Sequence, residues 1–162
     1  MTDSPVRAGV RGGSPRTLQE LQDVQVIRDT LMRYWRGLDR AVPELVRAAY
    51  HDDGYDDHGY FKGPADGFVA SLDPVFRMDC TMHYTGQVSV GLAGDTALSE
   101  SYTEAHHITK DADGLASDGL YGLRYVDHWE RRAYEHMRSK FLAAGWPVEH
   151  LEFDPKMVIR GL

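Results

Sequence analysis

Apolar residues recur at helical spacing near the start of the chain, in TLQELQDVQVIRDTLMRYWRGLDR, residues 17–40. The apolar positions, at steps of three and four, are Ile27, Leu31, Tyr34, Trp35 and Leu38. This period places them on one face of an amphipathic helix, and Thr17 with Glu20 has the spacing of a capping box at its start. VPELVRAAY, residues 42–50, predicts a second, short helix with Pro43 in its first turn.

A region rich in glycine and proline follows. HDDGYDDHGYFKGPAD, residues 51–66, predicts a loop with room for a short strand at residues 55–58. PADGFVASLDPVF, residues 64–76, predicts a third helix that is broken near Pro74.

The pattern then changes to a period of two, which is typical of strands. CTMHYTGQVSV, residues 80–90, is the first strand, and GLAGD ends it in a hairpin-type turn. TALSESYTEAHHITK, residues 96–110, and LYGLRYVDHWERR, residues 120–132, are two further long strands. Helices followed by antiparallel strands predict an α+β domain with helices on one face of a curved sheet. Residues 133–146 are ambiguous, because good helix formers stand where the sheet needs another strand to cover its edge.

Composition excludes several classes of protein. The net charge of −7 argues against a nucleic-acid partner, which needs concentrated Lys and Arg. No apolar run approaches the ~20 residues of a membrane span. The single cysteine, Cys80, excludes an intramolecular disulfide. Residues 1–16 lack the apolar core of a signal peptide and are interpreted as the disordered start of a cytoplasmic protein, ahead of one domain over 17–150 and a tail over 151–162.

Asp39 is the first candidate for chemistry. It follows Trp35 by four residues and Leu31 by eight, so it continues the edge of the apolar stripe. It also falls near a helix C-terminus, where the macrodipole disfavours a negative charge. The alternative is a surface acid paired with Arg36 or Arg40.

His83 and Tyr34 are the other two candidates. His83 lies on the polar face of the first long strand, and Tyr34 lies on the helix stripe. Alone, such a histidine is usually structural or solvated, and such a tyrosine is usually a core residue with a wet hydroxyl.

Histidines and acids gather in HDDGYDDH, residues 51–58, which invites a metal interpretation. The stretch fails the calcium-loop template, because glycine falls where ligands should be and no distal glutamate follows. A solvated acidic loop is the simpler interpretation. The two histidines of AHH, residues 105–107, lie on opposite strand faces, so one at most can share a pocket with His83. No metal or other cofactor is expected.

Taken together, these segments resemble a known family. IRDTLMRYWRGLDRAVPELVRAAYHDDGYDDHGYFKGPADGFVA, MHYTGQVSV, ALSESYTEAHH and RYVDHWERR are similar to SnoaL-like members of the NTF2-like superfamily, over about residues 24–132. The resemblance implies a cone in which helices close over a strongly bent antiparallel sheet, and it implies that His83 points into the pocket. It also favours a last strand over about residues 136–147.

Within the superfamily the chain is similar to scytalone dehydratase, lindane dehydrochlorinase and the bile-acid dehydratases. These enzymes imply a catalytic pair of Asp39 and His83, with Tyr34 as a hydrogen-bond donor to the substrate. His107 is the inward neighbour of Ala105, where the bile-acid dehydratases carry a further acid. The candidate substrate-binding residues are Trp35, Tyr50, Tyr55, Asp57, His58, Phe68, His107 and Trp129.

Three functions are compatible with these residues. The first is a cofactor-independent lyase or isomerase in which the Asp39–His83 pair is the general base on a hydrophobic small molecule. The second is a polyketide-type cyclase that uses the same pair, and the third is a non-catalytic small-molecule-binding module. The outer face of the first strand is expected to carry Met82, Tyr84, Val88 and Val90, an apolar patch that predicts a homo-oligomer, a dimer or trimer.

Overall fold

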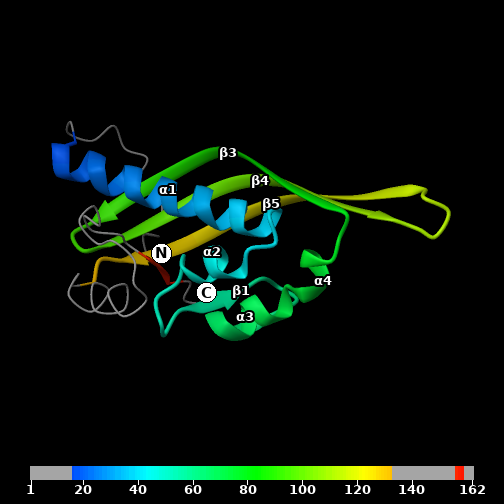
Figure 1. Ribbon diagram of the computed structural model, residues 1–162. Helices are drawn as coiled ribbons and strands as arrows, with labels where there is room; N and C mark the ends of the chain where they lie inside the picture. Colours follow the sequence, from blue (N-terminus) through cyan, green and yellow to red (C-terminus); the bar gives the residue numbers. More distant parts are fainter. Residues whose placement is uncertain (1–15, 133–155, 159–162) are drawn as a thin grey trace, which may run out of the picture.

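A computed structural model describes residues 16–132 and 156–158 of the chain (Figure 1). The predicted disordered segment, apart from residue 16, and the predicted strand over 136–147 lie outside the described residues. The predicted α+β class is confirmed, since helices precede an antiparallel sheet. No helix of the described residues is long and apolar enough to cross a membrane.

The first helix, α1, runs from Leu18 to Asp39 and begins at the predicted capping box. The Thr17 side chain accepts a hydrogen bond from the Glu20 backbone, and the Glu20 carboxylate accepts one from the Thr17 N–H at 2.7 Å. Helix α2, Pro43–Arg47, turns back against α1. A Cβ built on Gly37 would lie 2.9 Å from Leu45 Cβ, so the two helices approach each other at a position that only glycine allows.

A small lobe follows the two helices. It contains strands β1, Tyr55–Asp57, and β2, Lys62–Pro64, which pair antiparallel. Helix α3, Ala65–Ser71, and helix α4, Asp73–Phe76, then stand in place of the single broken helix that the sequence predicted. Phe68 of α3 is fully buried and anchors this lobe in the core.

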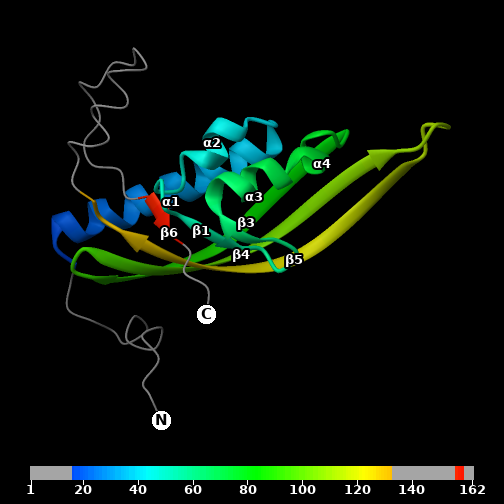
Figure 2. The same cartoon turned by 90° about the horizontal axis from the view of Figure 1, so that it is seen from below.

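The main sheet is antiparallel in the order β3-β4-β5-β6. Its strands are β3, Cys80–Ala93; β4, Thr96–Lys110; β5, Ala116–Glu130; and β6, Lys156–Val158. The helices lie together on one face of this sheet, and the β4–β5 hairpin projects beyond them as an arm (Figures 1 and 2). The face of the sheet that packs against the helices is called the inner face. The opposite face, the outer face, is not covered by the described helices.

A β-bulge in β3 corrects one prediction. Thr85 pairs with Thr103, but the next pair is Val88 with Ser101, so β3 carries one extra residue at this point. A bulge of this kind reverses the facing of every later side chain in its strand. Met82 and Tyr84, before the bulge, are 47% and 68% exposed on the outer face as predicted.

The same prediction was wrong for Val88 and Val90, which follow the bulge. Val90 is buried in the core under the helices, and Val88 packs against that core. The sequence alternates smoothly through Gly86 and Gln87, so its period gave no sign of the reversal.

Candidate active site

Asp39 and His83 meet on the inner face of the sheet. The Asp39 carboxylate holds His83 twice: Oδ1 lies 2.7 Å from Nδ1 of the ring, and Oδ2 accepts a hydrogen bond from the His83 backbone N–H at 3.1 Å. The histidine side chain is only 4% exposed and that of Asp39 is 23% exposed. The alternative interpretation of Asp39, as a surface acid paired with Arg36 or Arg40, is therefore not what the structure shows.

Local structure explains why these two residues meet. Asp39 is the last residue of α1, and the end of that helix lies over the beginning of β3. The Thr81 hydroxyl donates to the Leu38 carbonyl at 3.3 Å, a carbonyl that also accepts the Ala41 N–H at 3.2 Å, and this contact fastens the strand to the end of the helix. Because Thr81 and His83 share a strand face, this contact also fixes the direction of the histidine.

The two-point contact determines what the imidazole can do. A carboxylate has no proton to give at neutral pH, so Nδ1 is the nitrogen that carries the proton. Nε2 then has a free lone pair, and within the described residues it makes no hydrogen bond. An imidazole oriented by a carboxylate in this way is suited to act as a general base.

His107 and Tyr121 continue the inner face beside this pair. The rings of His83 and His107 are 5.9 Å apart between centroids, and those of His107 and Tyr121 are 5.1 Å apart. Burial, and next the nearby His83, lower the pKa of His107. His107 is therefore neutral at neutral pH and can both donate and accept hydrogen bonds at the edge of the site.

A second carboxylate–histidine pair lies in the lobe of β1 and α3. Asp56 is fully buried; its Oδ1 lies 2.7 Å from His58 Nδ1, and its Oδ2 accepts a hydrogen bond from the Tyr50 hydroxyl at 2.6 Å. The His58 ring stacks on Phe68 with centroids 4.4 Å apart and lies 5.6 Å from the Tyr125 ring. His58 is thus held on the core side of its lobe.

Asp127 of β5 is the most buried acid of the sheet. The Trp129 indole donates to the Ser99 hydroxyl at 2.9 Å, and that hydroxyl donates to Asp127 Oδ2 at 3.1 Å. Burial raises the pKa of Asp127 to about 7, opposed by the hydrogen bond from Ser99. Asp127 was not predicted from the sequence as a site residue, although it lies on the same strand face as Trp129, which was predicted.

The remaining predicted site residues divide into two groups. Five are at most 3% exposed in the core: Tyr34, Trp35, Tyr50, Phe68 and Trp129. Tyr55 and Asp57 instead face away from the interior, since they flank Asp56 on a strand of three residues. Asp57 pairs with Lys62 at 2.7 Å on the surface, so the structure does not bring Tyr55 or Asp57 to the Asp39–His83 pair.

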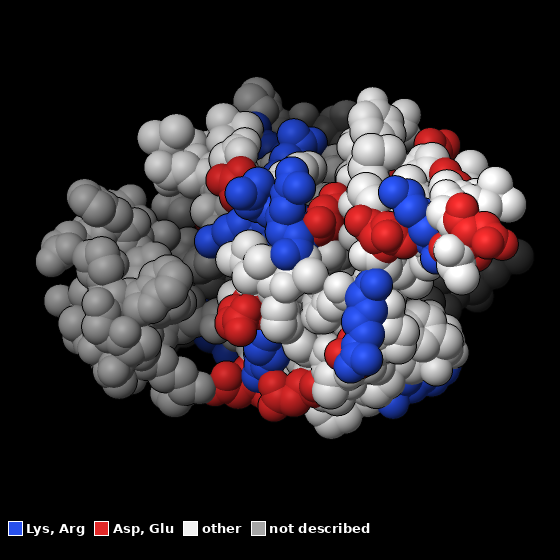
Figure 3. Space-filling model, turned by 45° about the vertical axis from the view of Figure 1, so that its right-hand side comes forward, with Lys and Arg blue, Asp and Glu red and all other residues white. Residues whose placement is uncertain are grey.

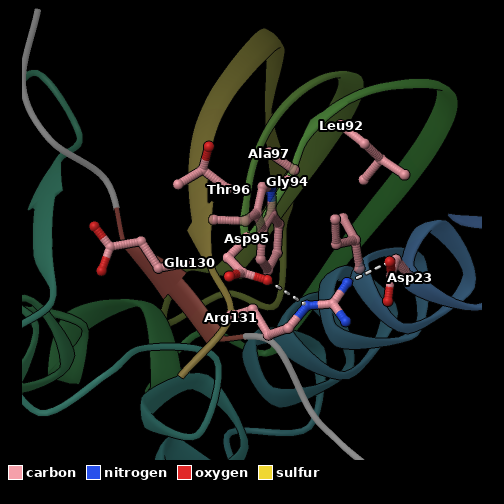
Figure 4. Close-up of a pocket in the computed structure, with 10 residues that line it drawn as sticks. Asp23, Leu92, Gly94, Asp95, Thr96, Ala97, Glu130 and Arg131 are labelled. Carbon is pink, nitrogen blue, oxygen red and sulfur yellow. Dashed lines mark hydrogen bonds and ion pairs between the residues drawn. The ribbon is translucent and has the colours of Figure 1, made fainter. Parts of the chain in front are cut away.

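A small pocket lies at the end of the sheet away from the Asp39–His83 pair, and its residues have a structural role (Figure 4). Arg131 lies there between Asp23 of α1, with which it makes an ion pair, and Asp95 of the β3–β4 turn, whose Oδ1 is 3.5 Å from Nε. The cavity measures about 20 Å³, which is room for roughly one water molecule. Its ion pairs tie the helix to the sheet.

Among the described residues, neither the charged side chains nor the potential metal ligands indicate another functional site. Lys and Arg are interspersed with Asp and Glu on the face shown in Figure 3. No group of three or more His, Cys, Asp or Glu in residues 16–132 and 156–158 could hold a metal ion. The neighbour of His107, His106, turns to the outer face and pairs with Asp118 at 2.8 Å.

Comparison with known proteins identifies the family to which the chain belongs. The SnoaL-like domain family matches residues 19–152, so the chain belongs to this family, as the resemblance predicted. The comparison with curated proteins gave no match.

Solved structures share the fold. A "putative scytalone dehydratase" from Novosphingobium aromaticivorans DSM 12444 matches with a TM-score of 0.62 and 19% identity, over 70% of this chain and 76% of that one. A hexachlorocyclohexane dehydrochlorinase (LinA) of type 2 matches with a TM-score of 0.60 and 17% identity, over 71% and 79%. The Kfla4162 protein from Kribbella flavida matches with a TM-score of 0.63 and 19% identity, over 86% and 91%. At these identities the likeness establishes the NTF2-like fold.

Proposed function

We propose that the protein is a cofactor-independent lyase or isomerase, of the dehydratase kind, that acts on a hydrophobic small molecule. The observation that carries this proposal is the Asp39–His83 contact of 2.7 Å on the inner face, with Nε2 of the imidazole left free. The dehydratase and dehydrochlorinase names of two structural neighbours support it. A binding module needs no carboxylate-oriented imidazole, whereas proton abstraction does.

The proposed reaction begins with a proton transfer to His83. Nε2 takes a proton from a carbon next to a carbonyl group or in an allylic position, and the electron pair of the C–H bond forms the new C=C bond. In a dehydration the C–O bond on the adjacent carbon breaks, and the departing oxygen takes the proton back from the imidazolium and leaves as water. In an isomerisation the imidazolium returns the proton to another carbon. Asp39 stabilises the imidazolium in both cases.

A substrate panel tests this proposal. The protein would be incubated with cyclic β-hydroxyketones, conjugated ketones and a linear polyketide analogue in the presence of a chelator. Loss of water, a shift of the double bond or ring closure would be followed by NMR. We expect turnover without any added cofactor. Ring closure of a linear polyketide analogue, with none of these reactions, would support a cyclase, and tight binding without turnover would support a binding module. Either result would overturn the proposal.

We also propose that the protein is a homo-oligomer that forms through the outer face of the sheet. This face carries an open groove of about 630 Å³ lined in part by Tyr84, Tyr102 and Arg124. The two tyrosines are 68% and 47% exposed, and Met82 beside them is 47% exposed. Apolar patches of this kind mark interaction surfaces.

Light scattering tests the oligomer. We expect a dimer or trimer at micromolar concentration, and we expect a Tyr84→Glu variant to shift the mass toward the monomer, because the change buries a charge in the interface. A Leu115→Glu variant at the tip of the arm is the matched control and should keep the wild-type mass. A monomeric mass for the wild-type protein would contradict the proposal.

A further inference from the structure

Three aromatic rings form a row on the inner face that leads away from the Asp39–His83 pair. The His107 ring lies 5.9 Å from the His83 ring, and the Tyr121 ring lies 5.1 Å further on from His107, between centroids. The three residues come from the neighbouring strands β3, β4 and β5. The His83 side chain is 4% exposed, whereas Tyr121 at the other end is 51% exposed. The row therefore runs from the proposed base to open solvent.

Gly119 determines where the Tyr121 ring lies. This glycine is the β5 partner of His107, and a Cβ built on it would lie 3.1 Å from Tyr121 Cε2 and 3.2 Å from the tyrosine hydroxyl oxygen. The ring therefore leans over the glycine and toward His107. Gly119 is not among the glycines with a positive φ, and the β4–β5 register continues through it without a bulge. The backbone does not require a glycine here, and a glycine inside a regular strand often marks a place where a ligand approaches closely.

The chemistry of the row favours a planar ring as its ligand. Burial, and next the nearby His83, lower the pKa of His107, so the middle of the row is uncharged at neutral pH. Aromatic rings attract one another in offset-stacked and edge-on arrangements with centroids about 4.5–7 Å apart, and a puckered saturated ring cannot make these contacts. Because Tyr121 is half exposed, a ligand reaches its ring from solution and needs no closed cavity.

We propose that Tyr121, held over Gly119, selects the substrate by stacking on a planar, unsaturated ring and directs that ring along the row to Nε2 of His83. This assignment rests on the function proposed above and names its substrate class, an aromatic or conjugated cyclic compound. Such a ring also suits the reaction, because the electron pair of the broken C–H bond is delocalised over its double bonds.

The test compares two probes with the same carbon skeleton, the planar β-naphthol and the puckered β-decalol. Binding of each would be measured by calorimetry, and the informative quantity is the ratio of the two affinities. We expect Tyr121→Ala to lower the ratio in favour of β-naphthol by about two- to tenfold, the scale of one aromatic contact. Tyr121→Phe should keep the wild-type ratio, because the ring remains.

Gly119→Val separates the position of the ring from its presence. Valine is well tolerated in a strand, but its side chain would occupy the space where the Tyr121 ring now lies. The ratio should therefore fall as in Tyr121→Ala, although the tyrosine is still there. Leu115→Ala, which removes an exposed apolar side chain at the tip of the arm, is the matched control and should keep the wild-type ratio. Urea unfolding would show that every variant is folded.

NMR of the histidine rings locates the probe. We expect β-naphthol to shift the ring signals of His107 and to leave those of His106, which faces the opposite side of the sheet, unchanged. Both measurements report binding alone, so they can succeed even if the substrate panel shows no turnover. Failure of β-naphthol to bind, shifts at His106 in place of His107, an unchanged ratio in Tyr121→Ala or Gly119→Val, or an equal fall in Leu115→Ala would each overturn the proposal.

Discussion

Replacing His83 by alanine is expected to lower kcat/KM by about 10²–10⁴-fold, the usual contribution of a general base. The reason is that Nε2 is the free nitrogen of a ring whose other nitrogen is held by Asp39 at 2.7 Å. Asp39→Asn should cause a loss of the same kind, because an amide neither selects the same tautomer nor stabilises the imidazolium. The measurement is the initial rate of product formation from the ketone that the substrate panel identifies.

The rates of the Asp39–His83 double variant and of a matched control variant extend this prediction. The double variant should be scarcely slower than either single one, since the two residues act as a unit. His106 makes a similar contact with Asp118, at 2.8 Å, on the outer face of the same sheet. His106→Ala should therefore keep the wild-type rate. Fully multiplicative losses in the double variant, or an equal loss in His106→Ala, would show that the Asp39–His83 pair is not the base.

Asp127→Asn is expected to remove a pH dependence of stability. Burial raises the pKa of Asp127 from 3.8 to about 7 in the folded protein, which therefore binds a proton that the unfolded chain has released. The contribution of Asp127 to the free energy of unfolding is therefore fully present below the pKa that this group has in the unfolded chain, and it declines as the pH rises from about 4 to 7. This shift corresponds to a loss of up to about 4 kcal/mol. The isosteric amide of asparagine stays neutral and can still accept the hydrogen bond from Ser99.

Urea unfolding at several pH values measures this effect. Asp56 raises the pKa of Asp127 and His58 lowers it, so the informative quantity is the difference in stability between the wild type and Asp127→Asn. We expect the variant to gain stability relative to the wild type as the pH rises through this window. Asp113→Asn, at the tip of the arm, should show no such gain. Parallel pH profiles for the wild type and Asp127→Asn would contradict a buried neutral carboxyl group.

Local patterns predicted the parts of the fold that local physics determines. The capping box of Thr17 and Glu20 marks the start of α1, because both of its hydrogen bonds form within one turn. Strand β4 covers the predicted residues, Thr96–Lys110, since its alternation is uninterrupted. The bulge before Val88 was not predictable, because it depends on how β3 pairs with β4 rather than on the residues of β3 alone.

The candidate site was predicted in the same uneven way. The pairing of Asp39 with His83 came from a family resemblance, since neither helix nor strand periodicity can bring together residues that are 44 positions apart. On the short strand β1, Asp57 was predicted as a site residue, but the buried acid of this strand is Asp56. A strand of three residues has too few positions for its inward side to be assigned from alternation. Asp127 was missed because hydrophobicity gives no signal for a buried acid.

The most direct test of the proposed mechanism is whether His83 takes a proton from carbon. The protein and the His83→Ala variant would be incubated in D₂O with the conjugated ketones of the substrate panel, and deuterium at their carbon atoms would be followed by NMR. We expect the wild-type protein to incorporate deuterium at a carbon next to the carbonyl group or conjugated with it, and we expect His83→Ala to do so about 10²–10⁴-fold more slowly. Exchange at the same rate in both proteins, or exchange in neither, would contradict this mechanism.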